Sequence, residues 1–111
     1  MAIAHARPGE IIDIRPLKEE IAATRTRTLF KTDAMEVIRL VLRAGKRIAE
    51  HKTPGEIMVQ CLEGHVRFTA GGKTQEMTAG EMLYLSGAEP HAVDAVEDSS
   101  VLVTILFCEG A

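Results

Sequence analysis

Residues 56–86 read EIMVQCLEGHVRFTAGGKTQEMTAGEMLYLS, and this stretch decides the fold class. Four short runs are separated by glycine: Gly64 ends the first, Gly71 and Gly72 form a hairpin signal, and Gly80 precedes the last. Short strands joined by such turns are typical of antiparallel sheets that close into a jelly roll or barrel. We therefore expect an all-β chain with an antiparallel barrel.

Alternation of side chains continues outside this stretch. In EVIRLVL (36–42) a purely apolar face alternates with a face that mixes valine and arginine. The apolar face carries Ile38, Leu40 and Leu42, and the mixed face carries Val37, Arg39, Val41 and Arg43. We expect the mixed face to lie outside the barrel, with valines that a second subunit could cover. Residues 91–96 and 101–107 are expected to form the last two strands.

The N-terminal part has weaker signals. Residues 10–14 (EIIDI) predict a short strand that Pro16 ends, and residues 17–23 predict a helix of about two turns. No Pro/Gly/Ser-rich linker divides the sequence. We expect one domain, in which residues 1–32 pack as an N-terminal strand and short helix on a barrel formed by residues 33–111.

Composition narrows the classes of function. The chain has 111 residues, 46% of them hydrophobic and 4% aromatic, so we expect an aliphatic core. Neither a run of about 20 apolar residues nor a secretory signal is evident, which predicts a cytoplasmic protein without a membrane partner. A net charge of −3 argues against nucleic acid as a partner. Cys61 and Cys108 are expected to be reduced and unbridged.

Two further stretches carry spacing that suggests a site. The first runs from Gly45 over five residues to His51 and on to Gly64, and the second runs from Gly80 to His91. These stretches resemble the two motifs of the cupin superfamily, Gly-x5-His-x-His-x3–4-Glu-x6-Gly and Gly-x5-Pro-x-Gly-x2-His-x3-Asn. The resemblance implies a double-stranded β-helix barrel, usually a homodimer. It also implies a divalent metal (Fe, Mn, Zn, Ni or Cu) held by three histidines and one glutamate.

The metal ligands of that motif are only partly present. His51 and His91 occupy ligand positions, whereas Thr53 stands at the second histidine position and Ile57 at the glutamate position. Glu56 lies beside the vacant position, but neighbouring strand residues point to opposite faces, so we expect Glu56 to point outwards. Two imidazoles make an incomplete site, because zinc and non-haem iron sites use at least three protein ligands. We expect at most a weakly held divalent transition metal at His51 and His91.

The barrel interior is the predicted pocket for a small molecule. Its expected residues are His51, Thr53, Ile57, Val59, Cys61, Tyr84 and His91. The leading hypothesis is a small-molecule-binding protein, acting as a sensor, carrier or accessory protein. The first alternative is a metal-dependent oxygenase or isomerase that uses His51 and His91. The second is metal-free proton transfer, as in the sugar-nucleotide epimerases of the superfamily, with a histidine as base and Tyr84 as acid.

Overall fold

The computed structural model describes residues 5–87 and 89–107, and this part of the chain is almost entirely β-structure. The single helical element there is a 3-10 helix, η1 (Lys18–Ala23). The strands are β1 (Arg27–Lys31), β2 (Met35–Leu42), β3 (Arg47–His51), β4 (Ile57–Glu63), β5 (His65–Ala70), β6 (Lys73–Thr78), β7 (Met82–Leu85), β8 (His91–Ala95) and β9 (Ser99–Leu106). The expected all-β class is confirmed.

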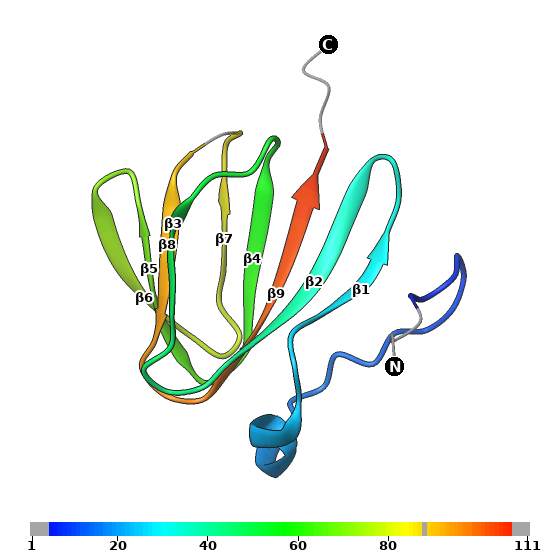
Figure 1. The fold of residues 1–111 in the computed structure, drawn as a ribbon, viewed down its shortest axis with the longest axis horizontal. Coiled ribbons are helices and arrows are strands. Elements are labelled where there is room, and N and C mark those ends of the chain that lie inside the picture. The colour runs from blue at the N-terminus through cyan, green and yellow to red at the C-terminus, as the bar shows by residue number, and fades with distance from the viewer. Residues whose placement is uncertain (1–4, 88, 108–111) are drawn as a thin grey trace.

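The strands form two antiparallel sheets that face each other (Figure 1). The five-stranded sheet has the order β1-β2-β9-β4-β7, and the four-stranded sheet has the order β3-β8-β5-β6. The chain therefore passes from one sheet to the other at several points, for example between β4 and β5 and between β8 and β9. This arrangement is the two-layer jelly roll that the short, glycine-bounded strands predicted.

The corner between β4 and β5 depends on a glycine packed against a serine. Gly64 has a φ of 92°, and a Cβ atom there would lie 2.3 Å from Oγ of Ser99 and 2.5 Å from the carbonyl oxygen of Asp98. The Ser99 hydroxyl accepts a hydrogen bond from the backbone N–H of His65 (2.9 Å) and donates one to the carbonyl of Glu97 (2.7 Å). One buried side chain thus joins both crossings at this end of the barrel.

The core fills the space between the two sheets and is aliphatic, as the composition predicted. Its buried members are Leu42, Ile57, Val59, Cys61, Val66, Phe68, Met77, Val93, Ala95 and Val101. A second, smaller cluster of Leu29, Val37 and Leu102 lies on the other face of the five-stranded sheet, with Ile12 packed against it. The sheet is therefore covered on both faces along β2 and β9.

The N-terminal segment provides that second cover (Figure 1). The short helix expected at 17–23 is present as η1, with Ile21 buried. The strand expected at 10–14 is wrong, because residues 11–17 have no regular structure. Ile12 packs on the second cluster while Ile11 is exposed, so the alternation is real, but among the described residues the backbone of 10–14 forms no ladder of hydrogen bonds with the nearby edge strand β1.

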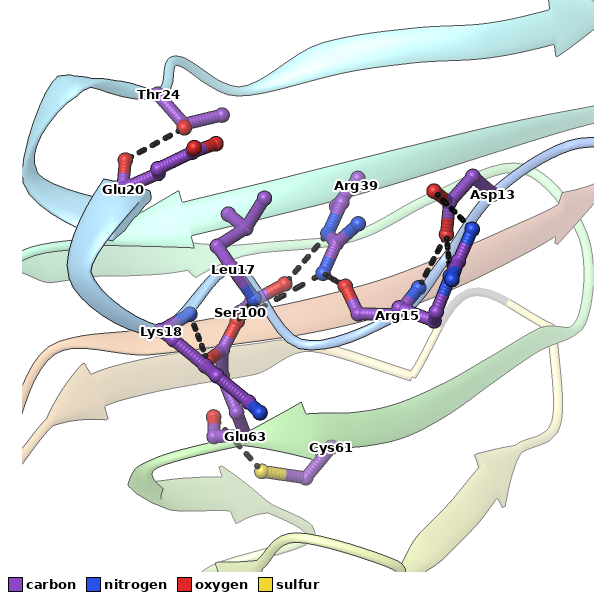
Figure 2. Close-up of polar contacts among 10 residues, drawn as sticks. All are labelled: Asp13, Arg15, Leu17, Lys18, Glu20, Thr24, Arg39, Cys61, Glu63 and Ser100. Carbon is purple, nitrogen blue, oxygen red and sulfur yellow. Dashed lines mark hydrogen bonds and ion pairs between the residues drawn. The ribbon is translucent and has the colours of Figure 1, made fainter.

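The mixed face of β2 lies on the outside of the barrel, as expected, but its Arg39 is buried by other parts of the same chain. This residue is only 4% exposed. Its Nε donates to Oγ of Ser100 (2.7 Å) and its Nη2 donates to the carbonyl oxygen of Arg15 (2.5 Å), as Figure 2 shows. The guanidinium is stable there because each contact replaces water with an oxygen acceptor.

Glu63 completes the attachment of the N-terminal segment (Figure 2). Its carboxylate accepts hydrogen bonds from the backbone N–H groups of Leu17 (2.6 Å) and Lys18 (3.0 Å) at the start of η1. Oε1 of Glu63 also lies 3.7 Å from Nη2 of Arg39. These contacts mean that the chain covers the outer face of β2 with its own N-terminal segment, where a second subunit was expected.

Three further expectations concern chain organisation. β1 pairs with β2, so residues 27–31 extend the barrel sheet, and a division of the domain at residue 32 stays a prediction. Cys61 is a buried free thiol, and burial raises its pKa. Cys108 lies outside the described residues, so its pairing stays a prediction. Within the described part of the chain, no helix has the length and apolar character needed to cross a membrane.

Candidate ligand-binding site

A cavity of about 240 Å³ lies between the two sheets. Its lining consists of Ile38, Leu40, Ile48, His51, Thr53, Ile57, Val59, Phe68, His91, Val93, Val103 and Ile105. Alternation explains which side chains reach it: residues two apart on β4, such as Ile57 and Val59, point inwards, as do their partners Ile105 and Val103 on β9. The lining is apolar except for His51, Thr53 and His91.

The two histidines come together through strand pairing. His51 ends β3 and His91 begins β8, and their Cα atoms are partners across the two strands. The ring centroids are 4.4 Å apart, with an interplanar angle of 61°. Phe68 on β5 stacks on His91, with centroids 5.7 Å apart and planes 10° apart. The His91 ring therefore contacts two other rings.

Backbone contacts determine which ring nitrogen is free. Nδ1 of His51 lies 2.9 Å from the carbonyl oxygen of Ala49, and Nδ1 of His91 lies 2.9 Å from that of Glu89. A carbonyl can only accept, so each Nδ1 carries the proton and donates it. In the neutral rings, Nε2 then carries a lone pair.

Burial sets the charge of His91. This residue is 6% exposed, and burial lowers the pKa of its imidazole, with the nearby His51 adding to the effect. The hydrogen bond to the Glu89 carbonyl opposes the shift but is the smaller effect. His91 is therefore neutral at neutral pH, whereas His51 lies exposed at the edge of the cavity.

Other expected pocket residues lie elsewhere. The expectation that Tyr84 lines the interior is wrong: its side chain is 74% exposed and lines an outer hollow with Glu56 and Met58. The reason is register, because Tyr84 pairs with Met58, which points outwards between the inward Ile57 and Val59. Tyr84 consequently cannot act as an acid for a base in the cavity.

Cys61 is also absent from the cavity lining. It points to the same side of β4 as Ile57 and Val59 but lies farther along the strand, where the core is filled. Phe68, in contrast, lines the cavity and was missed. Its inward direction could have been read from alternation, since the polar residues Arg67 and Thr69 stand on either side of it in the sequence.

Comparison with known families gives the identity of this barrel. The family model described as the cupin domain matches residues 38–107, which include both histidines. The chain belongs to the cupin family. Among curated proteins, none matches the sequence significantly.

Solved structures share the cupin fold with this chain. A conserved protein of unknown function from Streptococcus pyogenes is 22% identical, with a TM-score of 0.76 over 98% of this chain and 96% of that one. A cupin superfamily protein from Desulfitobacterium hafniense is 16% identical, also with a TM-score of 0.76, over 93% and 100% of the two chains. A salicylate 1,2-dioxygenase from Pseudaminobacter salicylatoxidans is 21% identical over 65% of this cupin, with a TM-score of 0.62. This match spans 21% of the dioxygenase.

The cupin family implies a divalent metal, and the residues present do not fit one. Known zinc sites use three or four protein ligands, and the non-haem iron arrangement uses two histidines and a carboxylate. Among the residues that the structure describes, no group of three or more His, Cys, Asp or Glu side chains is placed to hold a metal ion. At the carboxylate position, Ile57 is buried in the apolar lining. His51 and His91 alone make an incomplete donor set.

Proposed function

We propose that this cupin binds a small, largely apolar molecule in its barrel interior without a resident metal, as a sensor, carrier or accessory protein. The observation that carries the proposal is the lining: one cavity between the sheets joins nine apolar side chains to three polar ones. Ligand sites have this composition, in which apolar walls provide affinity and a few polar groups fix orientation. His51, Thr53 and His91 are the proposed polar contacts, and Ile57 and Val59 form part of the apolar wall.

The size of the cavity limits the ligand. A dry apolar cavity of about 150 Å³ in another protein holds benzene. The cavity here, at about 240 Å³, has room for a single ring with one or two substituents. The proposal also includes a cytoplasmic location and assembly as a homodimer.

Filling the cavity tests the proposal. A panel of single-ring compounds is expected to raise the melting temperature of the wild-type protein, because a ligand that binds only the folded state stabilises it. Val103→Phe places a larger side chain in the cavity and should abolish these shifts. Met82→Phe is the matched control, because Met82 is 54% exposed on β7. Equal shifts in wild type and Val103→Phe would contradict binding in the barrel.

The second candidate function is a metal-dependent oxygenase or isomerase, favoured by the contact between the two histidine rings. Elemental analysis of untagged protein separates the two candidates. Our proposal predicts well under one equivalent of any transition metal, because two imidazoles bind far more weakly than a complete site. Stoichiometric Fe, Ni, Cu or Zn that survives a mild chelator would favour the metal enzyme.

A further inference from the structure

Every polar side chain in the cavity lining offers a hydrogen-bond acceptor and no free donor. Nδ1–H of His51 and of His91 is used by a backbone carbonyl. The hydroxyl of Thr53 donates to the carbonyl oxygen of Gly55 (3.2 Å), which leaves only its lone pairs. Within the described residues, Nε2 of neither histidine has a hydrogen bond. The polar side chains of this apolar cavity can therefore accept hydrogen bonds from a ligand but cannot donate them.

We infer that the barrel interior selects a neutral ligand that carries a hydrogen-bond donor, such as a phenolic hydroxyl, over ligands that carry only acceptors or a negative charge. The inference rests on the proposed function and names the ligand class of the same site. Both histidines line the cavity, so a ligand donor there can meet the lone pair of either ring. A ligand oxygen without a proton is itself only an acceptor, so it cannot form a hydrogen bond with these lone pairs.

Desolvation makes this selection strong. A polar ligand group that leaves water for an apolar cavity loses its hydration, and only a hydrogen bond inside the cavity compensates for the loss. A carboxylate would lose still more, because a buried anion needs a donor or a positive charge. Neither histidine offers a free donor, since each Nδ1–H is already bonded to a backbone carbonyl.

The stack of rings also orients the ligand. Phe68 and His51 both contact the His91 ring, and its Nδ1–H is bonded to the Glu89 carbonyl, so the direction of its Nε2 lone pair is fixed before a ligand enters. Fixed acceptors reduce the ordering cost of binding and sharpen the difference between a donor and a non-donor. Ile57, where a carboxylate would otherwise stand, keeps this part of the wall apolar.

Two isomers provide a matched test. p-Cresol and anisole have the same formula, but only p-cresol has an O–H, and benzoate adds the anion. Dissociation constants are measured by NMR titration of the full chain above neutral pH, with a chelator present. We expect p-cresol to bind roughly tenfold more tightly than anisole, which is the effect of one net hydrogen bond, and benzoate to bind most weakly.

The outcomes separate this inference from the proposed function. Equal binding of p-cresol and anisole, or tighter binding of benzoate, would overturn the donor preference and leave ligand binding in place. Absence of binding by all three compounds would overturn both. If the preference appears only when the chelator is omitted, a metal ion carries it and the inference is wrong.

Variants assign the preference to the histidines. His91→Leu and, separately, His51→Leu should bring the p-cresol to anisole ratio close to one. His51 is exposed, so His51→Leu gives a result even if His91→Leu fails to fold. His65→Leu is the matched control, because His65 pairs with Glu76 on the same four-stranded sheet but does not line the cavity, and it should retain the wild-type ratio. A wild-type ratio in His51→Leu would contradict the role of the ring pair.

Discussion

The guanidinium of Arg39 lies 3.7 Å from the carboxylate of Glu63, although the two residues stand on strands that are not neighbours. β9 lies between β2 and β4, and its Ser100 accepts a hydrogen bond from Arg39. The pair therefore spans three strands on the outer face of the sheet. Both members also hold backbone groups of the N-terminal segment, which makes this pair the main polar attachment of that segment.

Removing the charge of Glu63 should loosen the N-terminal segment. Glu63→Gln leaves the buried Arg39 without its anion and removes an acceptor from the N–H groups of Leu17 and Lys18. We expect a loss of about 2 kcal/mol or more in the free energy of unfolding, measured with denaturant. Glu76→Gln, at an exposed ion pair with Arg67, is the control and should cost much less, because solvent screens such a pair. Equal losses would show that the attachment is weak.

The Gly64 corner should tolerate no side chain. Gly64→Ala combines a left-handed backbone with overlap against Ser99, and we expect a loss of about 3 kcal/mol or more in the free energy of unfolding. Gly72→Ala has a similar positive φ of 75° but meets nothing within 4 Å, so it should cost only about 1–2 kcal/mol. A similar loss in both variants would mean that backbone strain alone, without the contact to Ser99, sets the cost.

Stability should fall on acidification because of His91. Its pKa in the folded state is lowered by burial below the ordinary value of 6.5, so below that pH the unfolded chain binds a proton that the folded chain does not. The stabilising effect is complete above pH 6.5 and is lost as the pH falls towards the folded-state value. Denaturant unfolding between about pH 8 and about pH 5 should show a shallower decline in His91→Gln than in the wild type. Parallel curves would contradict a neutral, buried His91.

We expect a homodimer to form through the outer face of β4 and β7. The N-terminal segment covers β2 and β9, whereas Met82 and Tyr84 are exposed on β7, which ends the sheet. Light scattering at micromolar concentration should give twice the chain mass of 12.1 kDa. Tyr84→Glu should shift this mass towards that of the monomer, because it buries a charge at the interface. A light-scattering mass of a single chain for the wild-type protein would contradict the predicted homodimer.

Alternation and glycine turns in the sequence determined the strands and the class of fold. The strands at 36–42, 91–96 and 101–107 and the four runs within 56–86 could be placed, because a half-buried strand requires apolar residues at every second position and a turn requires residues that adopt positive φ. The spacing between Gly45 and His51 and between Gly80 and His91 also pointed to the pair of histidines. Sequence further indicated the incomplete ligand set, since the residues at Thr53 and Ile57 can be read directly.

Tertiary structure alone decided the faces that the sequence leaves ambiguous. In MLYL (82–85) every residue is apolar or aromatic, so alternation cannot choose a face, and pairing with β4 turned Tyr84 outwards. Arg39 reads as a solvated residue on a strand, and only the return of the N-terminal segment buries it. The segment at 10–14 alternates like a strand but forms no ladder of backbone hydrogen bonds with a strand in the described part of the chain. In each case the deciding contact joins residues far apart in the chain, and a local pattern carries no information about such a contact.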